Sequence, residues 1–181
     1  LLHHAGRNQV ALSYFLGFLT HYALDVRTHP YVYFKSCNKH HVCFETQLDN
    51  ALLQLHGIPL QQISPAAQMH LTRQELATLN AMWRDVGRAV YGEDMRNAFA
   101  SAYNAYRLMI SLRFDPTNTK YRLMSALERL AGKRPFISLM LAQEEVAGGV
   151  DYLNLEQEPW EHAWADTIHQ DSVPDLIETA A

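Results

Sequence analysis

Residues 10–26, VALSYFLGFLTHYALDV, decide the fold, because this run is apolar on nearly every face that a helix would have. We therefore predict a helix from about Gly6 to Val26 that is buried on all sides. The apolar part ends at His21 and is too short and too polar at its end to cross a bilayer. We accordingly expect no integral membrane segment.

Histidine and carboxylate side chains recur at helical spacing in and after this run. His21 precedes Asp25 by four residues, and His41 precedes Glu45 by four residues. Residues i and i+4 share one helix face, with Cβ atoms about 6 Å apart. An unpaired carboxylate buried beside an imidazole is unfavourable unless a partner or a metal compensates. A buried His–Asp hydrogen bond would explain one pair, but two pairs with His29 close by favour metal binding.

Length and composition restrict the class of protein. The chain has 181 residues, which suits a single domain with a substantial core. Hydrophobic residues make up 48% and charged residues 19%, a globular composition, and the net charge of −4 argues against a duplex nucleic acid partner. The chain begins with Leu1 instead of methionine, so we expect a processed product or a longer protein whose N-terminal segment is missing here.

The two cysteines do not form a zinc-finger pattern. Cys37 and Cys43 are six residues apart, which is compatible either with a disulfide or with two reduced thiols. We expect reduced thiols and a cytoplasmic protein.

Helix signals fill most of the chain. Pro30 and the aromatic run at 31–34 should break the first helix, because the residue before a proline avoids the helical region. Thr72 and Glu75 have the spacing of a capping box. Further helices are predicted over residues 38–56 with Asn38 as N-cap, 72–91, 93–114, 120–131 and 136–146, with a short one opening at Ser172. Since no alternating strand pattern is longer than the run at 31–34, we predict an all-α, single-domain multi-helix bundle over residues 1–181.

Three segments resemble the zinc-dependent phospholipase C family of bacteria, most closely its uncharacterised members. They are GFLTHYALDVRTHPYVYF at 17–34, HHVCFE at 40–45 and DYLNLEQEPWEHAW at 151–164. That family shares its all-helical fold with single-strand nucleases, so the resemblance implies a bundle of the phospholipase C and single-strand nuclease type.

The resemblance also implies a set of metal ligands. In the secreted enzymes a His-x3-Asp pair, a further histidine and a later His-x3-Glu pair hold part of a trinuclear zinc cluster. The ligands implied by position are His21, Asp25, His29, His41 and Glu45, and they would bind two or three zinc ions. Asp25 would bridge two ions and orient the attacking water, which makes it the implied catalytic residue.

Some neighbouring residues allow two interpretations. His40 competes with His41, but only His41 has a carboxylate four residues later. Asp49 follows Glu45 by one turn and is either a partner of a ligand or a solvated residue. His162 either approaches the site or packs with the tryptophans of the tail.

Imidazole and carboxylate ligands without thiolate suit catalytic zinc. Zinc ions in such a site activate water and neutralise a phosphodiester during hydrolysis. We therefore expect a phospholipase C-like phosphoric-ester hydrolase whose substrate is a phosphodiester such as a phospholipid head group. Two alternatives stay open: a non-catalytic metal-binding or degenerate family member, and a single-strand nuclease-like phosphodiesterase. The oligomeric state is not indicated.

Overall fold

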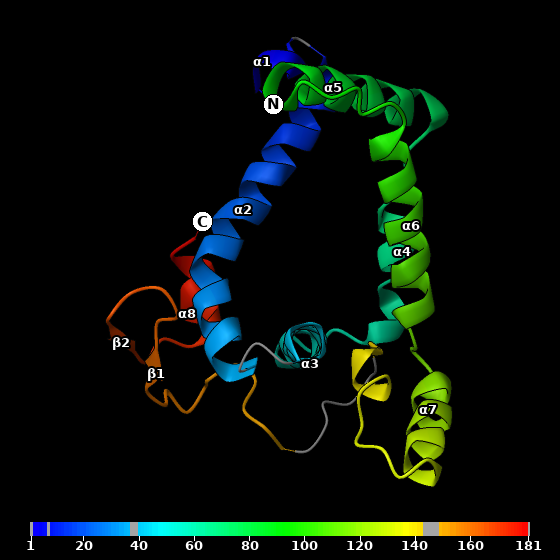
Figure 1. The fold of residues 1–181 in the computed structure, drawn as a ribbon. Helices are drawn as coiled ribbons and strands as arrows, with labels where there is room; N and C mark the ends of the chain where they lie inside the picture. The colour runs from blue at the N-terminus through cyan, green and yellow to red at the C-terminus, as the bar shows by residue number, and fades with distance from the viewer. Residues whose placement is uncertain (1, 7, 37–39, 143–148, 181) are drawn as a thin grey trace. The chain divides into compact units, whose positions relative to one another are not determined.

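The computed structural model describes residues 2–6, 8–36, 40–142 and 149–180. Helices dominate the described chain, which confirms the all-α class (Figure 1). The chain divides into two compact units: unit 1 comprises Leu1–Tyr22 and Pro65–Ser111, and unit 2 comprises Ala23–Ser64 and Leu112–Ala181. Within the described ranges, no helix combines the length and the hydropathy that a bilayer span requires.

Helix α2, Gln9–Ser36, continues through Pro30, so the predicted break at this proline is wrong. A proline inside a helix costs about 3 kcal/mol. Pro30, Tyr31 and Val32 are all buried, and each large apolar side chain that is buried contributes about 1.5–3 kcal/mol. The Tyr31 hydroxyl also donates to the Tyr152 carbonyl oxygen at 3.0 Å. Tertiary packing therefore outweighs the local preference of the proline.

The prediction that residues 10–26 are buried on all sides is also wrong. Leu16, Phe18, Leu19 and Tyr22 are between 39% and 60% exposed. An apolar sequence shows which faces a helix could bury, but burial itself requires neighbouring elements on those faces. The described residues cover α2 mainly near its two ends, at the cores of the two units.

Unit 1 contains α1, Leu2–Ala5, the first part of α2, and the helices α4, α5 and α6, which span Pro65–Gln68, Arg73–Tyr91 and Ala98–Arg113. The predicted capping box is confirmed: Thr72 Oγ1 accepts from the Glu75 amide at 3.2 Å, and Glu75 Oε2 accepts from the Thr72 amide at 2.7 Å. Gly92 ends α5 in the left-handed conformation, with φ of +69°. Helix α6 begins later than predicted, after Asn97, whose φ is +60°.

The core of unit 1 is built on α5. Leu79 and Met82 are buried with Ala11, and aromatic residues of α2 and α6 pack around them. The short helix α4 lies beside α6 (Figure 1), where Arg107 Nε donates to the Ala66 carbonyl oxygen at 3.0 Å. Pro65 is the first residue of α4, a position that suits proline because its missing amide hydrogen would have no partner in the helix.

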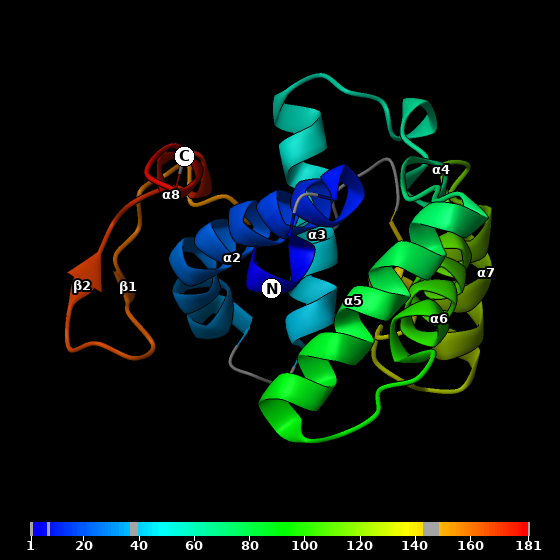
Figure 2. The same cartoon turned by 90° about the horizontal axis from the view of Figure 1, so that it is seen from above.

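Unit 2 is formed by the C-terminal part of α2 with α3, His41–Leu55, and α7, Thr119–Leu130, together with shorter elements. These are the 3₁₀ helices η1, Leu60–Gln62, and η2, Ser138–Met140, the strands β1, Trp160–Glu161, and β2, Ile168–His169, and α8, Val173–Glu178. The two strands pair antiparallel as a small hairpin (Figure 2). The predicted N-cap Asn38 and Cys37 lie outside the described residues.

The predicted helix over residues 136–146 is wrong in its described part. Residues 138–140 form η2, and Ala142 makes a parallel bridge with Phe114. The buried carboxylate of Glu128 holds this segment in a turn: it accepts from the Ile137 amide at 2.6 Å and from the Ser138 hydroxyl at 2.6 Å. These long-range bonds replace the local bonds of a helix, and residues 143–146 lie outside the described chain.

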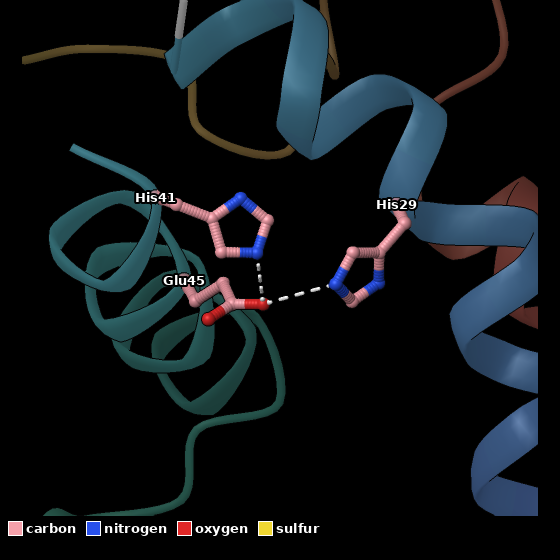
Figure 3. Close-up of side chains that lie close together, drawn as sticks. All are labelled: His29, His41 and Glu45. Atoms are coloured by element: carbon pink, nitrogen blue, oxygen red, sulfur yellow. Dashed lines mark ion pairs between the residues drawn. The ribbon is translucent and has the colours of Figure 1, made fainter. Parts of the chain in front are cut away.

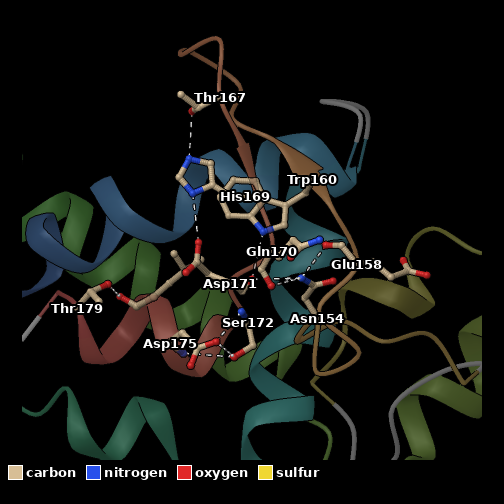
Figure 4. A network of polar contacts seen from close by, with 11 residues as sticks. Asn154, Glu158, Trp160, Thr167, His169, Gln170, Asp171, Ser172, Asp175 and Thr179 are labelled. Carbon is tan, nitrogen blue, oxygen red and sulfur yellow. Dashed lines mark hydrogen bonds and ion pairs between the residues drawn. The ribbon is translucent and has the colours of Figure 1, made fainter.

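The C-terminal tail packs against the core of unit 2, to which it contributes several buried side chains. Trp160 is 1% exposed, and its Nε1 donates to the Asp171 carbonyl oxygen at 3.1 Å. Asn154, in the left-handed region with φ of +54°, uses Nδ2 to bond three backbone carbonyl oxygens at 3.0–3.3 Å (Figure 4). The predicted capping box of Ser172 and Asp175 opens α8.

Candidate metal centre

Helices α2 and α3 bring three potential metal ligands together in unit 2 (Figure 3). His41 Nε2 lies 3.0 Å from Glu45 Oε1, and His29 Nε2 lies 3.6 Å from the same oxygen. One ligand atom from each of the three side chains lies within 4.8 Å of the other two. The centroids of the two imidazole rings are 5.1 Å apart. His29, on a different helix, therefore joins a pair that the sequence spacing already places on one face of α3.

These separations agree with the geometry of a zinc site. Zinc binds imidazole nitrogen and carboxylate oxygen at about 2.0–2.2 Å in a tetrahedral arrangement, so neighbouring ligand atoms are about 3.3–3.6 Å apart. Of the two nitrogen–oxygen distances, 3.6 Å lies at the upper limit of this interval and 3.0 Å lies below it. Small side-chain rotations would suffice to place all three atoms around one ion. The same contacts are also compatible with ion pairs between histidine and glutamate.

Asp25 contacts the opposite edge of the His29 ring. Asp25 Oδ1 lies 3.2 Å from His29 Nδ1, while the Nε2 atom of the same ring faces Glu45. His29 Nδ1 is buried, and in the described chain it makes no aligned hydrogen bond. A carboxylate on the far nitrogen of a metal-binding histidine commonly fixes the orientation of the ring. In this arrangement Asp25 would orient a ligand, whereas the resemblance implies that it bridges two ions.

The group is partly accessible to solvent. The side chains of His29, His41 and Glu45 are 32%, 30% and 38% exposed, respectively. Structural zinc sites are closed by four protein ligands, whereas catalytic sites combine three protein ligands with an open position for water. Three donors with partial exposure fit the second description.

The opposite face of α3 is anchored to the segment that contains η2. The Cys43 thiol, buried and not in a disulfide, donates to the Phe136 carbonyl oxygen at 3.6 Å. Gln47 Nε2 donates to the Leu139 carbonyl oxygen at 3.4 Å. Arg113 links the same segment to α3, because it donates to the Met140 carbonyl oxygen at 2.8 Å and to the Thr46 hydroxyl. These contacts hold the helix that carries two of the three donors.

Asp49 lies one turn after Glu45 on α3. Loss of hydration around its carboxyl, with a further contribution from the charge of Glu45, raises the pKa of Asp49 to about 6, although the residue as a whole stays exposed. Arg113 acts in the opposite direction. Because loss of hydration is the largest cause, the elevated pKa mainly reflects the surroundings of the Asp49 carboxyl, and the charge of Glu45 contributes less.

Three other candidate histidines are not members of the group that comes together in the described chain. His21 is exposed and belongs to unit 1. His40 packs against the ring of Phe136, with centroids 5.8 Å apart, and is not among the donors that come together. His162 stacks on Trp160 in the tail, which agrees with a packing role.

One of the basic residues close to the group in the sequence is engaged in an ion pair. Lys35 Nζ lies 3.5 Å from Glu158 Oε2 and 5.8 Å from the centre of the Tyr31 ring. A nucleic acid site would need cations that are available to phosphate groups. The ion pair of Lys35 reduces the positive charge available here.

Sequence patterns did not indicate two features that support the site. One is the Glu128 carboxylate that holds residues 136–138, and the other is the contact between His29 and Glu45. Glu128 is 8–10 residues from its partners, and His29 lies on a different helix from Glu45, so the i, i+4 spacing of a helix does not show either contact.

We compared the chain with protein-family models, with curated proteins and with solved structures, and none of these comparisons found a match.

Proposed function

We propose that this protein is a zinc-dependent phosphoric-ester hydrolase that resembles phospholipase C. The observation that carries the proposal is the cluster of His29, His41 and Glu45, whose ligand atoms all lie within 4.8 Å of one another. The absence of thiolate and the partial exposure of all three side chains support a catalytic rather than a structural ion. The sequence resemblance supports the choice of phosphodiesters, such as phospholipid head groups, as substrates.

The chain's own residues would each have a defined role. His29, His41 and Glu45 would hold the ion, and Asp25 would keep the His29 ring in position through its Nδ1 edge. Bound zinc supplies a water of lowered pKa and polarises a phosphoryl oxygen. A second or third ion would require Asp25 itself as a ligand, with His21 four residues earlier in α2; this part of the proposal rests on the sequence spacing alone.

The test combines zinc content with catalysis. The full chain is stripped with a chelator, reloaded with zinc and assayed by elemental analysis and by hydrolysis of bis(p-nitrophenyl) phosphate. We expect at least one zinc ion per chain and chelator-sensitive turnover. His41→Ala and Glu45→Gln should weaken zinc binding at least tenfold, and Asp25→Asn should weaken it by about 10–100-fold. His40→Ala is the matched control, because its ring packs on Phe136, and it should bind zinc like the wild type.

Each alternative predicts a different result. One tightly bound zinc without turnover would identify a non-catalytic metal site. No zinc binding, or equal binding by wild type and His41→Ala, would refute the metal centre and leave a degenerate family member. Faster cleavage of single-stranded oligonucleotides than of phosphatidylcholine vesicles would identify the nuclease alternative, which the ion pair of Lys35 makes less favourable.

A further inference from the structure

Unit 1 contains a cavity that takes no part in the metal centre. Its volume is about 1020 Å³, it opens to solvent, and every residue that lines it belongs to unit 1. Val10 and Tyr14 of α2, Trp83 of α5, and Phe99 and Met95 contribute to its walls. Sites for small molecules have volumes of about 300–1,000 Å³ and mainly apolar linings with a few polar groups. The cavity has the size and the character of such a site.

The aromatic side chains of the wall already pack on one another. Tyr14 is perpendicular to Trp83, with centroids 6.3 Å apart, and to Phe99, with centroids 5.4 Å apart. Phe99 is nearly parallel to Tyr103 at 6.5 Å. These rings pack on one another, and Met69 and Met95, whose side chains are adaptable, also line the cavity. Such a surface fits a flexible alkyl chain better than a flat ring system.

Several polar groups of the cavity are used to hold its own wall. The Tyr103 hydroxyl donates to the Met69 carbonyl oxygen and accepts from the Leu71 amide at 3.1 Å. Glu75 is engaged in the capping box of α5. Glu75 and His70 are lining residues, and the lining includes no lysine or arginine in the described part of the chain. A site with a carboxylate and no strong cation disfavours an anionic head group.

We propose that this cavity binds the alkyl chain of an uncharged single-chain lipid, such as a monoacylglycerol. The apolar wall favours binding because it removes the apolar surface of the alkyl chain from water. The neutral polar side chains Gln9, Ser13 and Gln68, which also line the cavity, can hydrogen-bond a hydroxylated head group.

Isothermal titration calorimetry of the full chain tests the proposal with three probes: 1-monodecanoylglycerol below its aggregation concentration, decanoate and 2-naphthol. We expect the monoacylglycerol to bind at least tenfold more tightly than the other two, with a negative heat-capacity change. Ala102→Trp and Ala98→Phe should weaken binding at least tenfold. Both alanines line the cavity and are exposed, so a larger side chain can enter it without disturbing the core.

Ala105→Trp is the matched control. This alanine is equally exposed on α6 and is not a lining residue, so binding should be unchanged. Circular dichroism checks that each variant folds. Equal affinity for decanoate would overturn the uncharged head group, and tighter binding of 2-naphthol would overturn the alkyl chain. The lipid site itself would be overturned if both cavity variants bound the probe as tightly as the wild type. It would also be overturned if sedimentation experiments showed a dimer whose formation blocks the probe.

Discussion

Replacing Glu128 should destabilise unit 2 by an amount that follows from its hydrogen bonds. The carboxylate accepts from three consecutive backbone amides, of Phe136, Ile137 and Ser138, and from the Ser138 hydroxyl. Phe136 and Ile137 are 47% and 53% exposed, so water can reach their amides, whereas Ser138 is fully buried. Two buried donors would thus lose their acceptor in Glu128→Ala. At about 1–3 kcal/mol for each, we expect a loss of about 2–6 kcal/mol.

The effect should depend on pH in a defined direction. Burial alone would raise the pKa of Glu128, but the hydrogen bonds from Ser138, Phe136 and Ile137 lower it below its ordinary value of 4.5. A carboxyl group with a lowered pKa in the folded protein contributes its full stabilisation above its ordinary pKa. That stabilisation is lost as the pH falls through the folded-state pKa. The difference between the wild type and Glu128→Gln should therefore be constant near neutral pH and should shrink below about pH 4.5.

Denaturant unfolding followed by far-UV circular dichroism and tryptophan fluorescence measures both effects. Glu128→Gln keeps one carbonyl-type acceptor and should cost only about 1–2 kcal/mol at pH 7. Arg129→Ala, at the next and exposed position of α7, is the control and should stay within about 0.5 kcal/mol of the wild type. This account would be refuted if Glu128→Ala were as stable as the wild type at pH 7. It would also be refuted if the difference in stability between the wild type and Glu128→Gln were the same at pH 7 and at pH 3.

Four further substitutions test other parts of the structure. The pKa of Asp49 is raised to about 6, so its charged form is disfavoured in the folded state. Asp49→Asn removes this unfavourable charge and should raise the denaturation midpoint at pH 8, where Asp49 is charged, and have little effect at pH 4, where it is protonated in the folded protein. Asn154→Asp would direct a carboxylate at three carbonyl oxygens and should lower stability at pH 7 by about 3 kcal/mol or more, measured by urea unfolding. Tyr31→Phe should cost about 1 kcal/mol in the same assay through the lost hydroxyl bond. In Gly87→Ala the new Cβ would lie 2.6 Å from Met95 Cγ, so the cost of overpacking should exceed the gain in helix propensity. Thermal unfolding should show a lower melting temperature for Gly87→Ala, and this decrease should disappear when Met95→Ala is added.

Helix ends were predictable where the signal is local. The capping boxes at Thr72 and at Ser172 both form, and Gly92 ends α5 with a positive φ. In each case a residue within three or four positions satisfies the free backbone groups, or a glycine adopts the conformation that other residues avoid. Such signals are complete within one turn of the chain, so the sequence alone was sufficient.

Prediction failed where distant residues decide the local structure. Pro30 stays within α2 because Tyr31 and Val32 are buried in the core of unit 2. Residues 136–138 form a turn because Glu128 accepts their amides. The core residues around Tyr31 belong to other elements, and irregular chain separates Glu128 from residues 136–138. Sequence spacing therefore identifies neither set of contacts.

The candidate site shows the same division. The i and i+4 spacing correctly places His41 beside Glu45, because helix geometry fixes this pair. The same spacing pairs Asp25 with His21 in the sequence argument, whereas the structure shows Asp25 Oδ1 3.2 Å from His29 Nδ1. The contact between His29 and Glu45 depends on how α2 and α3 pack, which no spacing rule contains. Sequence reasoning could therefore propose the residues of the group, and only the structure shows which ligand atoms meet.

The exposure of these side chains changes the argument for a metal. The sequence argument assumed that imidazole and carboxylate groups were buried and needed a cation to compensate for lost hydration. His29, His41 and Glu45 are in fact about one third exposed, so as ion pairs they would contribute only about 0–1 kcal/mol and would not by themselves require a metal. Both histidines approach the same carboxylate oxygen of Glu45, and all three side chains stay partly accessible to solvent. A site that combines convergent donors with an open position is suited to bind an ion together with water and substrate. Zinc content alone would show that an ion binds, and only turnover measured with it would show that the ion is catalytic.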